Sequence, residues 1–279
     1  MRRQILLLLP VILTCGCKPK GIPVPNYKYD DYGAFLGRND NDVTGFSNYS
    51  YVSLELDEFG DSNIERLTSK GVHFLAYLNV GSLETYRDYY EDYESITFKD
   101  YENWPDERWI DVSNQDWQNF VVNTLAKGFK NRNAFGVYLD NVDVYSVAKE
   151  GGLDYTAYAQ GLRNIIKGIS DLNLFVMVNG GSEFFEDMNE QNSDVFDYLW
   201  AYHQEEVFSL IKDYENNTFG KQSDEDREYY QQISTMMKEK GKEVFYLEYT
   251  TDKELQNTIK EYCDSNKYHY YFANDVDLK

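Results

Sequence analysis

Polar side chains follow most of the short apolar runs in this sequence, at positions where chemistry is possible. A strand that is buried on both faces has no structural reason to end in a carboxylate, because burying a charge costs free energy. Carboxylates gathered at such ends can act as general acids, general bases or nucleophiles. The polar residues concerned are Asn79, Asp140, Asn141, Asn179, His203, Gln204, Glu205, Glu248 and Asn274.

The runs that precede these residues alternate with longer helical patterns, which is typical of an α/β fold with a parallel sheet. The clearest helical pattern covers residues 115–130, behind a capping sequence at 113–116. No Gly-rich phosphate loop follows the first run, so eight repeats favour a single closed (β/α)8 barrel, a TIM barrel, over an open sheet. We predict strands at residues 33–37, 51–56, 73–79, 135–140, 174–179, 198–202, 244–248 and 268–273.

Residues 80–111 separate the third predicted strand from its helix and form a longer connection than is usual. This segment is rich in Tyr, Trp and Glu. Barrels of this class build their active sites from the carboxyl ends of the strands and the loops that follow them. We therefore expect the long loop after strand three to contact substrate.

Length and composition favour one large globular domain at residues 32–279. The chain has 279 residues, 42% of them hydrophobic and 27% charged, and α/β barrels of about 250 residues commonly form one domain. Its 27 basic and 48 acidic residues give a formal net charge of −21. Nucleic-acid backbones reward clusters of Lys and Arg, so nucleic acid is not an expected partner.

The N-terminal residues predict export. Arg2 and Arg3 precede an apolar run at residues 5–13, which is too short to span a hydrocarbon core of about 30 Å and is typical of a signal peptide. Gly16 before Cys17 resembles a bacterial lipobox. We expect a lipoprotein signal peptide at 1–16, lipidation of Cys17, a tether at 17–31 and attachment to a bacterial membrane in the cell envelope. A plain secretory peptide is the alternative.

Cysteine and histidine positions favour neither disulfides nor zinc. Only Cys17 and Cys263 remain after removal of the signal peptide, so a lipidated Cys17 leaves Cys263 without a partner. Cys263 lies in a helical pattern and is predicted to be a small packing residue. His73, His203 and His269 are far apart in the sequence, and no CxxC motif occurs. We expect no metal and no cofactor.

An ordered set of motifs resembles one enzyme family. The run Ala-Tyr-Leu-Asn-Val-Gly-Ser-Leu-Glu at residues 76–84 is followed by Arg87. The set covers nearly all of residues 33–277 and is similar to glycoside hydrolase family 114, the endo-α-1,4-polygalactosaminidases and their relatives. The fold of that family is a (β/α)8 barrel, in agreement with the strand count. The further matches lie at residues 104–111, 135–143, 178–181, 204–208 and 244–249.

The resemblance implies a glycosidase with two catalytic carboxylates. Asp140 matches the family's Asp after the fourth strand, and Glu205 its Glu after the sixth, so we expect a nucleophile and an acid/base respectively. One carboxylate must stabilise or trap the anomeric carbon while the other protonates the leaving oxygen. Glu206 adjoins Glu205, and neighbouring side chains of an extended segment face opposite ways, so only one of the two can point into the barrel. Glu205 is preferred; retaining and inverting chemistry both remain open.

Other residues are candidates for substrate binding. Glu84 and Arg87 are three residues apart, so a local ion pair is the alternative for them, and Asp143 can bind a substrate amine or cap a turn. Trp104 and Trp109 can stack on sugar rings or pack under the loop. Acidic neighbours such as Asp143 would raise the pKa of the acid/base. The candidates are Asp57, Tyr77, Asn79, Glu84, Arg87, Asn141, Asp143, Asn179, Glu206 and Glu248.

The implied substrate is a polysaccharide. A polymer of galactosamine with free amines is cationic, and an acidic cleft would attract it. Two alternatives are a surface lipoprotein that binds glycan without cleaving it and a hydrolase of a different α-linked glycan. The presence of both Asp140 and Glu205 favours an enzyme, because binding alone does not need a paired acid and nucleophile.

Overall fold

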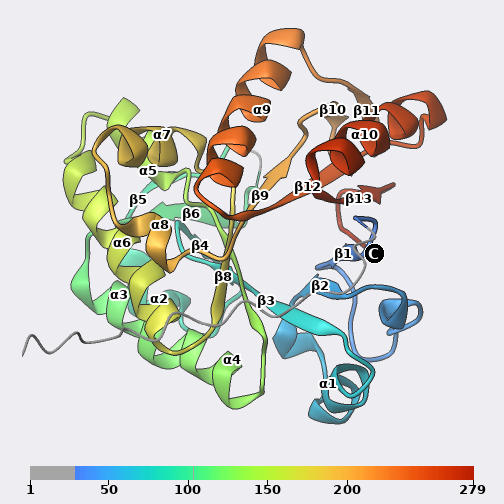
Figure 1. The fold of residues 1–279 in the computed structure, drawn as a ribbon. Helices are drawn as coiled ribbons and strands as arrows, with labels where there is room; N and C mark the ends of the chain where they lie inside the picture. Colours follow the sequence, from blue (N-terminus) through green and yellow to red (C-terminus); the bar gives the residue numbers. More distant parts are fainter. Residues whose placement is uncertain (1–28, 103) are drawn as a thin grey trace, which may run out of the picture.

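The computed structural model describes residues 29–102 and 104–279, and its centre is a sheet of eight parallel strands. The first and last strands lie side by side, and the amide of Tyr270 donates to the carbonyl of Tyr29 at 2.8 Å. The sheet is therefore a nearly closed barrel, as predicted (Figure 1). In spatial order its strands are β1 (Tyr32–Phe35), β2 (Tyr51–Leu54), β3 (His73–Asn79), β7 (Gly136–Asp140), β8 (Phe175–Asn179), β9 (Ala201–Glu205), β12 (Glu243–Tyr249) and β13 (His269–Ala273).

Helices surround the strands (Figure 1). Most outward-facing residues of the strands are apolar and pack against the helices; Val137 and Leu139 of β7, for example, belong to the same buried core as Ile165. This burial between two layers holds the barrel together. The helices are α1 (Asp61–Thr68), α2 (Tyr90–Tyr93), α3 (Gln115–Phe120), α4 (Lys127–Asn131), α5 (Val144–Glu150), α6 (Tyr155–Asp171), α7 (Ser182–Glu190), α8 (Val195–Tyr198), α9 (Asp224–Glu239) and α10 (Lys253–Asn266).

A second, smaller core fills the inside of the barrel. Side chains alternate along each strand, so Tyr138 lies inside while Val137 and Leu139 lie outside. At the carboxyl ends the inward positions change from apolar to polar, with Asp140 as the last residue of β7 and Glu205 as the last residue of β9. The barrel therefore presents carboxylates at one end.

The helical pattern at residues 115–130 is confirmed, with one local change. The side chain of Asn114 caps the helix by accepting hydrogen bonds from the amides of Asp116 at 2.9 Å and Trp117 at 3.1 Å. Between α3 and α4 the chain is π-helical over Val121–Ala126. The segment therefore runs from Gln115 to Asn131 without leaving the barrel surface.

The long connection after β3 contains a small sheet of its own. Its strands β4 (Ser82–Glu84), β5 (Thr97–Asp100) and β6 (Glu107–Ile110) pair antiparallel in the order β4-β6-β5. The connection leaves β3 at Gly81, where a Cβ atom would lie 1.7 Å from the carbonyl oxygen of Asn141. Only glycine fits this close approach to the loop after β7.

A hairpin that we did not predict follows β9. Its strands β10 (Ser209–Asp213) and β11 (Thr218–Lys221) pair antiparallel, and Figure 1 shows them near α9 and α10. Residues 206–208 join the hairpin directly to β9. The hairpin therefore rises from the carboxyl end of a barrel strand, where loops line the active site in this class of fold.

The sixth barrel strand is the one whose predicted position was wrong. Residues 198–202 were expected, but the strand is β9 at Ala201–Glu205, and Tyr198 ends the short helix α8. The polar residues His203 and Glu205 were placed beyond the strand because a buried strand was expected to be apolar. They lie within it because the barrel interior is itself polar at this end. The other predicted strands differ by at most two residues at either end.

The predictions for the signal peptide at 1–16, lipidation of Cys17 and most of the tether at 17–31 lie outside the described residues. The last residues of that segment belong to the folded domain, since Asp31 is buried and accepts a hydrogen bond from His269 Nδ1 at 2.6 Å. Cys263 is buried, as expected of a packing residue. Within the described residues, no helix has the length and apolar character needed to cross a bilayer.

Candidate active site

A cavity of about 1040 Å³ lies at the carboxyl ends of the barrel strands. Its wall includes the last residues of β7, β8, β9 and β12, which are Asp140, Asn179, Glu205 and Tyr249. The connection at 80–111, the β10–β11 hairpin and residues 276–279 also contribute. The structure thus brings the two predicted catalytic residues into one cavity, at the end of the barrel where they were expected.

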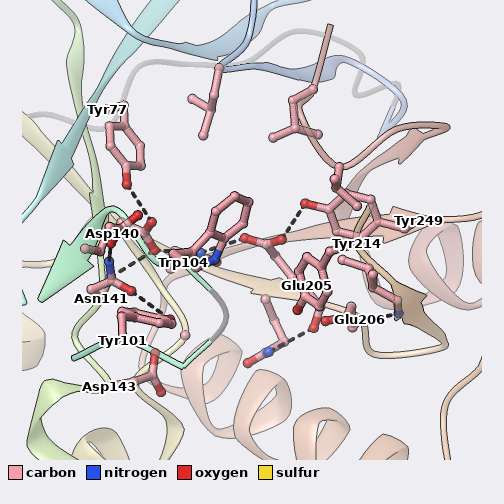
Figure 2. Close-up of a pocket in the computed structure, with 18 of the residues that line it drawn as sticks. Tyr77, Tyr101, Trp104, Asp140, Asn141, Asp143, Glu205, Glu206, Tyr214 and Tyr249 are labelled. Carbon is pink, nitrogen blue, oxygen red and sulfur yellow. Dashed lines mark hydrogen bonds between the residues drawn. The ribbon is translucent and has the colours of Figure 1, made fainter. Parts of the chain in front are cut away.

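Asp140 is held by three hydrogen-bond donors. The hydroxyl of Tyr77 donates to Oδ2 at 3.0 Å (Figure 2). The amide of Asn141 at 2.9 Å and Nδ2 of Asn179 at 3.0 Å donate to Oδ1. Burial raises the pKa of Asp140 above its ordinary value, and these three donors oppose that rise. The donors on both oxygens thus stabilise the ionised form of Asp140, while burial keeps its pKa above the ordinary value.

Glu205 lies across the cavity base from Asp140 and has hydrogen-bond partners of its own. Tyr249 donates to its Oε2 at 2.7 Å, and Tyr138 donates to its Oε1 at 3.2 Å. Burial raises the pKa of Glu205 to about 7, and the negative charge of Asp140 adds to the rise. Glu205 is therefore able to hold a proton near neutral pH.

One amide joins the two carboxyl groups. Nδ2 of Asn179 donates to Asp140 Oδ1 at 3.0 Å and to Glu205 Oε1 at 2.7 Å. Because both oxygens bind one nitrogen, the two carboxyl groups lie close together, a spacing compatible with the separation of about 5–5.5 Å found in retaining glycosidases. Asn179, predicted to bind substrate, lines the cavity but uses both hydrogens of its amide on the carboxyl pair.

Glu206 also lines the cavity but is turned toward the hairpin. It lies just past β9 with a φ of 56°, in the left-handed region that is uncommon for residues other than glycine. Its Oε1 accepts a hydrogen bond from the amide of Ile211. Figure 2 shows Glu205 beside Tyr249 and Glu206 directed away from Asp140. Of the two adjacent glutamates, Glu205 is the one linked to Asp140.

A third acidic group, Glu107, lies close enough to Asp140 to interact with its charge. Glu107 accepts hydrogen bonds through Oε2 from Ser82, from Asn79 at 3.1 Å and from Asn141 at 3.3 Å. Burial raises its pKa to about 7. Our sequence reasoning gave Glu107 no place in the site, yet it lines the cavity. Asn79 is buried behind the wall and supports it instead of facing substrate.

Glu84 and Arg87 form the local ion pair that was the alternative to substrate binding. Arg87 Nε lies 2.5 Å from Glu84 Oε2, and its guanidinium also reaches Glu55 at 2.7 Å. Glu84 and Glu55 line the cavity, whereas Arg87 stands behind them. The pair fixes the cavity wall and leaves Arg87 without access to substrate.

Two candidates lie away from the cavity. Asp57 is exposed and forms an ion pair with Arg132 at 3.3 Å. Glu248 is fully buried and faces outward from β12, where it accepts hydrogen bonds from the amides of Phe208 and Ser209 and from the Ser209 hydroxyl. The prediction that Asp57 and Glu248 bind substrate is not supported by these positions: alternation along β12 directs Glu248 away from the barrel interior.

Aromatic side chains complete the cavity. Trp104 is 40% exposed, and its ring meets that of Tyr214 edge to face at 5.9 Å, so the connection after β3 and the β10–β11 hairpin touch here. Trp109 is buried and stacks on Tyr101, whose hydroxyl donates to Asn141 at 3.3 Å. Of the two predicted stacking candidates, Trp104 faces the cavity and Trp109 packs beneath it.

The charge of the cavity is strongly negative. Asp143, at the start of α5, lines it and accepts a hydrogen bond from the amide of Gly181 at 3.0 Å. Of the described residues that line the cavity, Lys279 alone is basic. Among residues 29–102 and 104–279, no three His, Cys, Asp or Glu side chains are arranged to hold a metal ion. The acidic residues of the lining are Glu55, Glu84, Asp106, Glu107, Asp140, Asp143, Glu183, Glu205, Glu206 and Asp277.

Two residues that hold the carboxyl pair from below were not among the predicted site residues. Tyr138 lies two residues before Asp140, and His203 two residues before Glu205, so each shares the inward face of its strand. That spacing was visible for Tyr138, but aromatic residues in a strand are ordinary core residues. His203 was noted as a polar residue at a strand end, but its inward position was not predicted because the sixth strand was placed at residues 198–202.

Comparison with known proteins assigns the chain to one enzyme family. A sequence model of glycoside-hydrolase family GH114 matches residues 31–275. The chain is 26% identical to an uncharacterised protein of Thermotoga maritima over 133 aligned residues. The aligned segment covers 44% of this chain and 40% of that protein's length.

Solved structures show the same fold. The glycoside hydrolase domain of PelA from Pseudomonas aeruginosa superposes with a TM-score of 0.73 at 14% identity, over 89% of this chain and 95% of that one. Ega3 of Aspergillus fumigatus, in complex with galactosamine, superposes with a TM-score of 0.69 at 16% identity, over 90% of this chain and 92% of that one.

Proposed function

Since the chain belongs to glycoside-hydrolase family GH114 and is thereby an O-glycosyl hydrolase, we propose that it cleaves an α-linked, galactosamine-containing polysaccharide, with Asp140 as nucleophile and Glu205 as acid/base. The observation that carries the residue assignments is the shared amide of Asn179, within hydrogen-bond distance of both carboxyl groups. It fixes two carboxyl groups close together at the base of an open cavity.

The environments of the two groups support different roles. Asp140 has donors on both oxygens, which favours the ionised form that a nucleophile needs. Glu205, with a pKa of about 7, holds the proton that the leaving oxygen needs. Two carboxyl groups of one site that differ in their hydrogen-bond donors can take the two roles of acid and nucleophile.

The close spacing supports a double-displacement reaction. In the first step an oxygen of Asp140 attacks the anomeric carbon while Glu205 gives its proton to the glycosidic oxygen, and the bond to the leaving sugar breaks. In the second step Glu205 takes a proton from water, whose oxygen displaces Asp140. Each step inverts the anomeric carbon, so the product retains its configuration.

The acidic cavity supports an amino sugar as the substrate. A protonated amine is cationic, and a cavity lined by ten acidic residues and one lysine attracts cations. Ega3, which has the same fold, is described in complex with galactosamine. A neutral glycan would gain nothing from this charge.

We extend the proposal to location: lipidation of Cys17 would anchor the enzyme at a bacterial membrane, and mass spectrometry of the mature chain tests it.

The experiment is hydrolysis of de-N-acetylated polygalactosamine by the full-length protein, compared with Asp140→Asn and Glu205→Gln. We expect the wild type to release shortened chains and each variant to lose at least about a hundredfold in kcat, the usual contribution of an acid/base group. Glu206→Gln is the matched control, since it lies next to Glu205 and lines the same cavity.

Three outcomes would change the proposal. If Glu206→Gln is inactive and Glu205→Gln retains its rate, the acid/base is misassigned. If the wild type cleaves another α-linked glycan and leaves polygalactosamine intact, the substrate is wrong. If the wild type binds these glycans and cleaves none, the protein is a glycan-binding lipoprotein.

A further inference from the structure

His203 lies directly beneath the carboxyl pair and has no contact with the cavity. It is fully buried inside the barrel on β9, two residues before Glu205, and is absent from the cavity wall. The rings of Tyr32 and Tyr138 meet it edge to face at 5.5 Å and 4.9 Å. A buried imidazole in such a place needs a reason, because polar groups in a core cost free energy unless they are hydrogen-bonded.

The contacts of the imidazole define which nitrogen carries the proton. Nδ1 lies 2.7 Å from Oδ1 of Asn179, an oxygen that can only accept, so Nδ1 must donate. Nε2 is buried and has no hydrogen-bond partner among the described residues. A proton on Nε2 would therefore be an unsatisfied donor. Both observations place the proton on Nδ1.

The orientation of the Asn179 amide follows from that proton. With Oδ1 held by His203, Nδ2 points at Asp140 and Glu205 and donates one hydrogen to each. The reversed amide would direct its oxygen at both carboxyl groups and leave their mutual repulsion unopposed. Tyr138 fits the same pattern, since its hydroxyl donates to Glu205 and its oxygen faces His203 Nδ1 at 3.3 Å.

We propose that His203 is a positioning residue, whose Nδ1–H holds the side-chain amide of Asn179 in the orientation that serves both carboxyl groups. The proposal rests on the proposed function for the roles of Asp140 and Glu205. Burial lowers the pKa of His203 to about 3, so the ring stays neutral and acts through direction, without adding a charge. Loss of the Nδ1–H lets the amide rotate and removes donors from the nucleophile and from the acid/base together.

The tautomer can be measured without any substrate. The chain has three histidines, and nitrogen NMR of the full-length protein labelled in histidine resolves Nδ1–H from Nε2–H rings. We expect His203 to remain a neutral Nδ1–H ring between about pH 5 and 8, and its Nδ1–H signal to weaken in Asn179→Ala. An Nε2–H ring in the wild type overturns the proposal.

Kinetics test the consequence with two variants of equal shape. His203→Asn keeps an N–H donor close to the position of Nδ1, while His203→Leu has nearly the same outline and no donor. We expect kcat of His203→Leu to fall at least about tenfold below that of His203→Asn, which corresponds to about 1.4 kcal/mol. KM should be similar in the two, because His203 is absent from the cavity wall.

A control pair at the other end of the barrel separates position from general packing. His73 is half-buried at the start of β3 and packs on Phe135 with ring centroids 4.6 Å apart. His73→Asn and His73→Leu should have equal kcat. Equal kcat in the two His203 variants would overturn the proposal. A wild type without hydrolase activity would refute the proposed function alone, since the NMR measurement still decides the tautomer.

Discussion

Asp140 and Glu205 share one amide donor yet differ in the rest of their contacts. Asp140 also receives a main-chain amide and the Tyr77 hydroxyl. Glu205 receives only tyrosine hydroxyls beyond that amide, and the charge of Asp140 faces it. Main-chain and amide donors favour a charged carboxylate, while burial beside a like charge favours a protonated one. The neighbouring groups therefore determine how readily each of the two carboxyl groups holds a proton.

This difference predicts the alkaline side of the pH–rate profile. In the proposed mechanism the protonated form of Glu205 is the acid, and its pKa is about 7. As the pH rises through that value Glu205 loses its proton, so kcat/KM should fall above about pH 7, by about tenfold for each further pH unit. The measurement is kcat/KM for polygalactosamine from acid to alkaline pH in the wild type.

A substrate that needs no acid is the control for the profile. With a nitrophenyl α-galactosaminide the leaving group departs without a proton, so the alkaline decline caused by Glu205 should disappear from the bond-breaking step. A decline that persists unchanged would mean that another group, such as Glu107 with its pKa of about 7, sets the profile.

Individual residues of the cavity could be predicted from the sequence where their type conflicts with their position. Asp140 is a carboxylate at the end of a buried strand, and that conflict is visible without a structure. Glu107 could not be predicted from such a conflict, since it lies in β6, a strand of a small sheet that no sequence periodicity predicts. The role of Asn179 depends on distances to side chains from two other strands, which sequence spacing does not contain.

At the scale of elements, Glu248 is the anchor of the β10–β11 hairpin. Its carboxylate accepts from the amides of Phe208 and Ser209 at 3.0 and 2.8 Å and from the Ser209 hydroxyl at 2.7 Å. The hairpin carries Tyr214 and Ile211 into the cavity wall. A buried carboxylate at the edge of the site thus shapes the cavity through the backbone, without contacting substrate.

Replacing Glu248 with Ala should destabilise the fold markedly. Two buried main-chain amides would lose their acceptor, and each unsatisfied donor costs about 1–3 kcal/mol. We expect the free energy of unfolding in denaturant to fall by at least about 2 kcal/mol. Glu243→Ala is the matched control on the same strand: its partly exposed pair with Lys238 at 3.1 Å is worth about 0–1 kcal/mol. Equal losses in both variants would show that Glu248 is not an anchor.

The elements of the barrel could be predicted, whereas the insertions could not. Eight runs of β-rich residues and the capped helix at Gln115 carry local patterns that survive in the structure. The strands β4, β5 and β6 are short and pair within one loop, so no periodicity marks them. The β9 boundary was missed because an inward-facing polar strand end looks like a loop.

At the scale of the whole molecule, the site imposes a pH dependence on the fold. Glu107 and Glu205 have pKa values of about 7 in the folded chain, against an ordinary value of 4.5. A group with a raised folded pKa stabilises the fold fully below its unfolded pKa and loses that contribution as the pH rises through its folded pKa. His203 acts in the opposite sense, since its folded pKa of about 3 costs stability as the pH falls below 6.5.

The protein should therefore be more stable at about pH 6 than at about pH 8. Between these values both glutamates gain protons in the folded state, and the protonation of His203 in the unfolded state offsets this gain only in part. One pKa unit corresponds to about 1.4 kcal/mol, and 1 kcal/mol shifts the melting temperature by about 2–4 °C in a domain of this size. We expect a melting temperature a few degrees higher at about pH 6 in thermal unfolding. Glu107→Gln keeps the acceptor for Ser82 and Asn79 but does not titrate. The difference in its melting temperature between the two pH values should therefore be smaller than in the wild type. An undiminished difference would mean that surface repulsion in this acidic chain, not the buried site, sets the pH dependence.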